Sequence, residues 1–130
     1  MTGAPAPYGA TIMDHFRRPR NQGPLPDADA AREGANPLCG DRIRIEIALR
    51  DGRVADARFT ANACAISVAA ASLLTERVRG MSAADIHAID DEEMVRSLGD
   101  EIPAARRACA VLPLSTMRNA LAILPGSADR

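Results

Sequence analysis

The chain has 130 residues, enough for one domain with a single hydrophobic core. Its formal net charge of −1 predicts no field that would attract nucleic acid, and no apolar run reaches the roughly 18 residues that cross a membrane. With two Phe, one Tyr and no Trp, the core is expected to consist mainly of aliphatic side chains and alanine. We therefore expect neither a nucleic acid nor a membrane as partner.

The two ends of the chain differ from its middle in composition. Residues 1–7 are predicted to be a disordered leader and residues 125–130 a C-terminal tail, which leaves residues 8–124 as the folded domain. The segment Met1–Ala10 has neither the charged nor the apolar region of a secretory signal. A cytoplasmic location with reduced thiols follows as an expectation.

The first predicted element is a short amphipathic helix over Tyr8–Arg18, where apolar residues recur with a spacing of four. A turn is expected over Arg17–Gly23, because the residue before a proline avoids the α conformation and because Asn and Gly favour turns. Pro24–Ala35 is rich in Pro, Asp and Ala and is expected to be a loop that could contain a short edge strand.

A β-hairpin is predicted next. Arg42–Ile47 alternates charged and β-branched residues, which is typical of a strand with one buried face. The dipeptide Asp51-Gly52 favours a tight hairpin turn. Val54–Thr60 is expected to return beside the first strand, with Val54 and Phe59 pointing inward.

The rest of the chain has a helical pattern. Ser67 is expected to cap a helix that runs to Gly80, and Ser82 with Asp85 resembles a capping box for a helix over Ser82–Ile89. The remaining predicted helices are Asp91–Leu98, then Ala104–Val111 after Pro103, an interruption at Pro113, and Leu114–Leu124. These elements predict an α+β domain, a small antiparallel sheet of about three strands packed against helices.

Three cysteines stand where predicted elements begin or turn: Cys39, just before Gly40 and Asp41; Cys64, before a helix; and Cys109, within a later helix. An odd number of cysteines cannot all pair in disulfides within one chain. Thiolates with a nearby carboxylate can hold zinc or an iron–sulfur cluster. The alternative is that the cysteines fill the core as small apolar side chains, because no C-x-x-C pair is present.

Other polar residues give weaker signals. His15 and His87 lie on predicted helices away from the cysteines, so structural or exposed roles are expected for both. Arg17, Arg18 and Arg20 could bind an anion or a partner, but a solvated surface is the simpler interpretation.

Several ordered motifs together resemble the U-type iron–sulfur cluster assembly scaffolds, the family of IscU, SufU and the N-terminal part of NifU. The resemblance runs from about Tyr8 to Leu124. DHFRRPRNQG at Asp14–Gly23 is similar to the family's D-H-x-x-N-P-R-N-x-G. The other matching segments are NPLCGD at Asn36–Asp41, DGRVADARF at Asp51–Phe59, CAIS at Cys64–Ser67, SLLTE at Ser72–Glu76 and RRAC at Arg106–Cys109.

The resemblance implies a scaffold, not an enzyme, with its metal site at one exposed end. Cys39, Cys64 and Cys109 would accept sulfur and bind the metal together with Asp41, and Cys109 would be the persulfide acceptor by its position in the family. The implied cofactor is a transient 2Fe-2S cluster, or zinc in the same site. The implied partners are a cysteine desulfurase and recipient apo iron–sulfur proteins, with the chain a monomer or weak dimer.

Departures from the family pattern leave two functions open. Ala108 stands where IscU-type members have a histidine before the last cysteine, which favours a SufU-like zinc-dependent sulfur acceptor. The short spacing between Cys64 and Cys109 leaves little room for the insertion usual in SufU and favours the cluster scaffold. Ile102–Arg106 is only a partial match to the chaperone-recognition segment of IscU, so dependence on a dedicated chaperone is not expected. A degenerate member kept for protein contacts is disfavoured because all three cysteines and Asp41 are retained.

Overall fold

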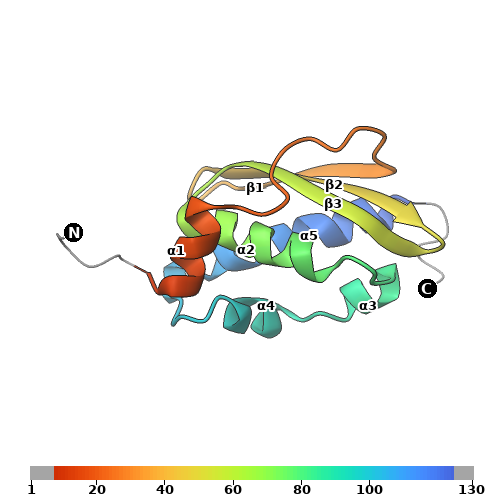
Figure 1. Cartoon of the computed structure of the whole chain (residues 1–130). Helices are drawn as coiled ribbons and strands as arrows, with labels where there is room; N and C mark the ends of the chain where they lie inside the picture. The colour runs from red at the N-terminus through yellow and green to blue at the C-terminus, as the bar shows by residue number, and fades with distance from the viewer. Residues whose placement is uncertain (1–7, 125–130) are drawn as a thin grey trace.

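The computed structural model describes residues 8–124, which form a three-stranded antiparallel sheet with helices packed on one face (Figure 1). The elements in chain order are α1 (Ala10–Arg17), β1 (Ala30–Asn36), β2 (Asp41–Arg50), β3 (Arg53–Asn62), α2 (Ala65–Arg77), α3 (Ala83–His87), α4 (Asp91–Ser97), the 3-10 turn η1 (Ala104–Arg106) and α5 (Arg107–Ala122). The predicted α+β class is confirmed. The predicted leader and tail lie outside the described residues.

The β2–β3 hairpin closes through the predicted turn. Asp51 and Gly52 have φ angles of 55° and 76°, the left-handed values that a two-residue hairpin turn requires. The register shifts where Leu49 pairs with Val54, which leaves Ala55 without a partner and makes a β-bulge. Because of this extra residue, Val54 and Phe59 are both buried on the helix-covered face, as predicted, although strict alternation would separate them.

Strand β1 is longer than expected. The strand has seven residues, begins inside the segment predicted as a loop with a short edge strand, extends one residue beyond it to Asn36, and pairs with β2 along its whole length. The strand packs on α5, and a Cβ at Gly34 would collide with the Thr116 side chain. Glycine is therefore needed where the helix crosses closest to the strand, and this tertiary contact compensates for the low strand propensity of the segment.

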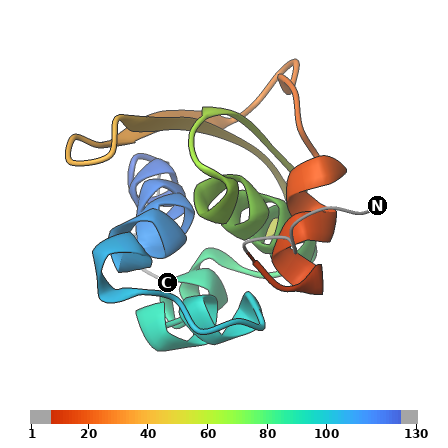
Figure 2. The same cartoon turned by 90° about the vertical axis from the view of Figure 1, so that its left-hand side faces the viewer.

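Two helices form the layer beneath the sheet. Figure 2 shows α2 and α5 side by side under the strands, with α1 next to α2 and with α3 and α4 on the side away from the sheet. Helix α2 is buried nearly all round, which fits its run of alanine and aliphatic residues. The core is aliphatic as predicted, with Phe59 its fully buried aromatic side chain. None of the helices described between residues 8 and 124 is long and apolar enough to cross a membrane.

Helix α5 corrects one prediction. Pro113 lies inside a continuous helix of 16 residues and does not interrupt it. A proline has no amide N–H, so the carbonyl of Cys109, four residues earlier, lacks its regular helical donor. The hydroxyl of Ser67 lies 2.9 Å from that carbonyl and can donate to it instead. A side chain from α2 thus compensates for the missing hydrogen bond and allows the helix to continue.

Candidate metal centre

Cys39 lies on the tight connection between β1 and β2. The amides of Cys39 and Gly40 both donate to the carbonyl of Asn36, at 3.2 and 2.8 Å, and the Asn36 side-chain oxygen accepts from the Leu38 amide at 3.2 Å. Gly40 has a φ of 73°, which an L residue rarely adopts. This turn holds Cys39 at the surface, where its thiol is exposed.

Asp41 is the first residue of β2 and is only 3% exposed. Its Oδ1 accepts from the amide of Cys64 at 3.0 Å, so the carboxylate satisfies one of the free N–H groups at the start of α2. Its Oδ2 accepts from the Ser67 hydroxyl at 3.1 Å and lies 3.6 Å from the sulfur of Cys64. Burial opposes ionisation, but hydrogen bonds from Cys109, the Cys64 amide and Ser67 outweigh it and lower the pKa of Asp41 below its ordinary value.

Cys109 lies in the first turn of α5 and is fully buried. Its sulfur is 3.6 Å from the sulfur of Cys39 and 3.7 Å from Nδ2 of Asn36, which can donate to it. Burial, together with hydrogen bonds to Asp41 and Cys39 and the charge of Cys64, raises the pKa of Cys109 to about 12. The thiol of Cys109 therefore holds its proton at neutral pH unless a cation binds beside it.

Cys64 is half-buried and precedes the first residue of α2. The predicted cap was wrong: the helix begins at Ala65, and Ser67 lies inside its first turn, where its hydroxyl contacts Asp41. The Cys64 sulfur touches Oδ2 of Asp41, so Cys64 joins the other predicted residues through that carboxylate.

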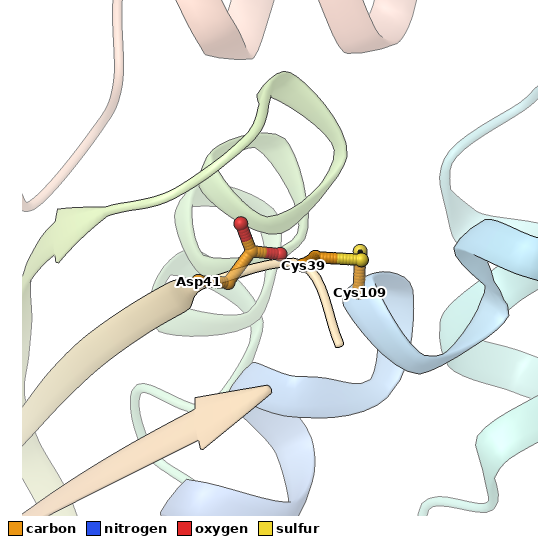
Figure 3. Close-up of side chains that lie close together, drawn as sticks. All are labelled: Cys39, Asp41 and Cys109. Atoms are coloured by element: carbon orange, nitrogen blue, oxygen red, sulfur yellow. Dashed lines mark hydrogen bonds between the residues drawn. The ribbon is translucent and has the colours of Figure 1, made fainter. Parts of the chain in front are cut away.

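Three of the four predicted residues form a tight group. One ligand atom from each of Cys39, Asp41 and Cys109 lies within 4.8 Å of the others (Figure 3). Two thiolates on one tetrahedral zinc, with Zn–S bonds of about 2.3 Å, would place their sulfurs ~3.8 Å apart. The observed 3.6 Å between the sulfurs of Cys39 and Cys109 fits that geometry and is too long for a disulfide.

The same sequence matches the model of one domain family, the NifU-like N terminal domain, over residues 7–128. The chain belongs to this family. It is 32% identical over 114 residues to the iron–sulfur cluster assembly scaffold protein IscU 1 of Archaeoglobus fulgidus, covering 88% of this chain and 74% of that protein. It is 44% identical over 73 residues to the zinc-dependent sulfurtransferase SufU of Bacillus subtilis, covering 56% of this chain and 49% of that protein.

A crystal structure of a NifU-like protein from Brucella abortus has the same fold. It superposes with a TM-score of 0.74 at 21% identity and covers 88% of this chain and 91% of that chain. The α+β architecture of the NifU-like domain described above is therefore common to both proteins.

The sequence did not indicate three residues that contact the candidate centre. Asn36 can donate to the sulfur of Cys109, Ser67 contacts Asp41, and Nη1 of Arg106 lies 3.8 Å from the sulfur of Cys39. One signal was available for Ser67, because a proline within a predicted helix frees the carbonyl four residues earlier and that carbonyl needs a donor. Asn36 and Arg106 reach the centre through the packing of β1 and α5, which no local pattern encodes.

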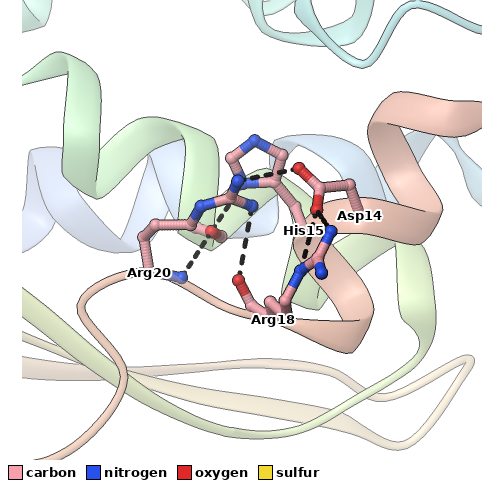
Figure 4. A network of polar contacts seen from close by, with 5 residues as sticks. Asp14, His15, Arg18 and Arg20 are labelled. Atoms are coloured by element: carbon pink, nitrogen blue, oxygen red, sulfur yellow. Dashed lines mark hydrogen bonds and ion pairs between the residues drawn. The ribbon is translucent and has the colours of Figure 1, made fainter.

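A second polar cluster lies where α1 meets α2. It contains His15, for which a structural or exposed role was expected, together with Arg18 and Arg20, which were expected to be solvated and instead pair with a carboxylate. Asp14 forms ion pairs with Arg18 and Arg20, each at 2.7 Å (Figure 4). Nδ1 of His15 is 2.7 Å from the buried hydroxyl of Ser72, which also accepts from the Arg20 amide. These contacts tie α1 and the turn after it to α2.

The remaining residues of that prediction lie at the surface. Arg17 is exposed at the end of α1, and His87 is exposed at the end of α3. Neither histidine belongs to the tight group of potential ligands found among residues 8–124.

Proposed function

We propose that this NifU-like domain is an iron–sulfur cluster assembly scaffold. It receives sulfur from a cysteine desulfurase, assembles a 2Fe-2S cluster on Cys39, Asp41, Cys64 and Cys109, and transfers it to recipient apo proteins. The observation that carries the proposal is the convergence of two sulfurs and a carboxylate within 4.8 Å of one another at an edge of the fold where Cys39 is exposed. In this role the chain is a scaffold and not an enzyme.

The donor set suits a cluster that must be both held and released. Thiolates bind iron tightly, whereas a carboxylate oxygen is a weaker ligand that another donor can replace. Asp41 is held by the Cys64 amide and by Ser67, which orient it before any iron arrives. Arg106, beside Cys39, places a positive charge next to the negative charge that sulfide and thiolates bring.

Reconstitution of the full chain with iron and sulfide under anaerobic conditions tests this proposal. We expect iron and acid-labile sulfide in equal amounts, together with thiolate-to-iron charge-transfer bands. The Cys39→Ser variant should lose both while it keeps its fold, because Cys39 is exposed and its replacement removes a ligand and no core packing. A chain that takes up no iron, or a Cys39→Ser variant that holds the cluster as well as the unmodified chain, would contradict the proposal.

Two observations favour a second function, zinc-dependent acceptance of persulfide sulfur. Ala108 precedes Cys109, and the relative with 44% identity is a zinc-dependent sulfurtransferase. Zinc in this site would stabilise the thiolates. The Cys109 thiolate would attack the outer sulfur of a persulfide on the desulfurase, so that one S–S bond forms on Cys109 and the donor's S–S bond breaks. The electron pair of the broken bond leaves with the donor cysteine as its thiolate.

The Cys109→Ser variant tests this second function. It should abolish the stimulation of the cognate desulfurase, because serine cannot carry a persulfide, while the circular dichroism spectrum of the chain stays unchanged. Full stimulation of the desulfurase by Cys109→Ser would remove Cys109 from the sulfur transfer.

A further inference from the structure

Ser67 connects two residues of the candidate centre and is not one of its predicted ligands. Its side chain is fully buried on α2. Its Oγ lies 3.1 Å from Oδ2 of Asp41 and 2.9 Å from the main-chain carbonyl of Cys109. One hydroxyl thus bridges the start of β2 and the first turn of α5, two elements that meet at the centre.

The carbonyl that Ser67 contacts is made available by Pro113. In a regular helix the Cys109 carbonyl would accept from the amide of residue 113, but a proline at that position has no N–H to donate. A buried carbonyl without a donor is costly. Proline at 113 therefore creates, close to the Cys109 side chain, an acceptor that only a group from outside the regular helix can satisfy.

The hydroxyl has one proton for two acceptors. A carboxylate and a carbonyl can only accept, so at any moment Ser67 donates to one of them and its other contact is weaker. The two acceptors share this proton, and neither can move far without losing it. The position of the Asp41 carboxylate is in this way coupled to the position of the backbone that carries Cys109.

We propose that Ser67 is a positioning residue that holds Asp41 and Cys109 in the relative position that a cation requires. Pro113 frees the Cys109 carbonyl, which is the second acceptor on which this role depends. The inference rests on the proposed metal site but concerns a side chain that does not itself bind the metal. Partners of this kind orient metal ligands before the metal binds.

Titration of the full chain with Co²⁺ tests the role, because cobalt reports both affinity and ligand geometry through its visible bands. Ser67→Ala should weaken Co²⁺ binding about tenfold and shift the ligand-field bands, as expected when the orientation of a ligand is lost. Ser72→Ala is a matched control, since Ser72 is equally buried on the same helix but contacts His15 and Arg20. This control should leave the Co²⁺ affinity and spectrum unchanged.

The Pro113→Ala background makes the test specific. It restores an amide that can donate to the Cys109 carbonyl, so Ser67→Ala there removes only the contact with Asp41. Of the two contacts one is lost, and Co²⁺ binding should weaken by less than about threefold. An equal loss in both backgrounds, or no loss and no spectral change in Ser67→Ala, would overturn the positioning role. Failure of the unmodified chain to bind Co²⁺ would instead overturn the metal site itself, so the two failures are distinguishable.

Discussion

Ser67 and Ser72 lie on the same helix and are both fully buried, yet the polar clusters around them differ in how their charges are balanced. Around Ser72, the Asp14 carboxylate is paired with the guanidinium groups of Arg18 and Arg20, and these hydrogen bonds lower its pKa to about 2. Around Ser67, the Asp41 carboxylate is held by an amide, a hydroxyl and thiols, and no arginine between residues 8 and 124 is bonded to it.

The difference separates a cluster that holds the fold together from one suited to bind a ligand. In the cluster around Ser72, the charges of Arg18 and Arg20 balance the charge of Asp14, so the cluster needs no metal ion for charge balance. The cluster around Ser67 gathers sulfur and oxygen atoms in one place, where the buried Cys109 thiol stays protonated because its pKa is raised to about 12. A metal ion can replace those protons and balance the charge of the thiolates. Buried polar groups that are not paired as they are around Ser72 are expected at functional sites.

The largest effect that the comparison predicts on stability concerns Ser72. Ser72→Ala removes the buried hydroxyl that hydrogen-bonds to the His15 ring and accepts from the Arg20 amide. The free energy of unfolding should therefore fall by about 2 kcal/mol. Urea denaturation measures the loss, and zinc affinity measured on the same variant should stay unchanged. A variant that is as stable as the unmodified chain, or one that no longer binds zinc, would contradict the distinction between a cluster that stabilises the fold and a cluster that binds a ligand.

Asp41→Ala should have a smaller effect on stability and a separate effect on the cluster. Because Asp41 satisfies the free amide at the start of α2, its loss should lower the free energy of unfolding by about 1 kcal/mol. A reconstituted cluster should also be released several-fold more slowly, since the exchangeable ligand is gone. Transfer to an apo ferredoxin, followed by absorption, measures the lifetime of the cluster. An unchanged or shorter lifetime would exclude Asp41 as the exchangeable ligand.

The smallest effect is a dependence of stability on pH. Burial and the positive charge of Arg20 lower the pKa of His15 below its ordinary value of 6.5. Above about pH 6.5 the histidine is neutral in both the folded and unfolded chain, and below it the unfolded chain takes up the proton first. The contribution of His15 is therefore complete above that pH and is lost as pH falls towards its folded pKa.

Urea denaturation at a series of pH values checks this prediction. His15→Gln should lose stability less steeply than the unmodified chain as the pH falls below about 6.5. His87→Gln serves as the control, because His87 is exposed, and it should keep the slope of the unmodified chain. Identical slopes for His15→Gln and the unmodified chain would show that His15 does not contribute.

Local signals predicted the hairpin, whereas tertiary contacts decided the elements that were missed. The Asp51-Gly52 turn requires left-handed angles that these residues adopt readily, so the sequence alone identifies it. Strand β1 has no such pattern, and its length follows from pairing with β2 and from the close approach of α5 at Gly34. Proline usually ends a helix, and Pro113 is tolerated because Ser67, distant in sequence, satisfies the freed carbonyl.

The candidate centre was predicted from the family motifs rather than from local patterns. Spacing alone did not distinguish Cys39, Cys64 and Cys109 from buried core cysteines, because three different elements carry them. Their role as ligands, with Asp41, remains a prediction to which the geometry now adds distances. The contacts of Asn36 and Ser67 with the centre were not predicted, since each forms only after the sheet and helices pack. Pro113 indicates that the Cys109 carbonyl needs a donor, but it does not identify Ser67 as that donor.

The most direct test of the contrast between the two clusters is zinc K-edge X-ray absorption on the full chain loaded with one equivalent of Zn²⁺. We expect three sulfur ligands at about 2.3 Å and one oxygen ligand at about 2.0 Å, which would correspond to Cys39, Cys64, Cys109 and Asp41. A spectrum with nitrogen and oxygen ligands alone would place the zinc elsewhere on the chain and contradict the account.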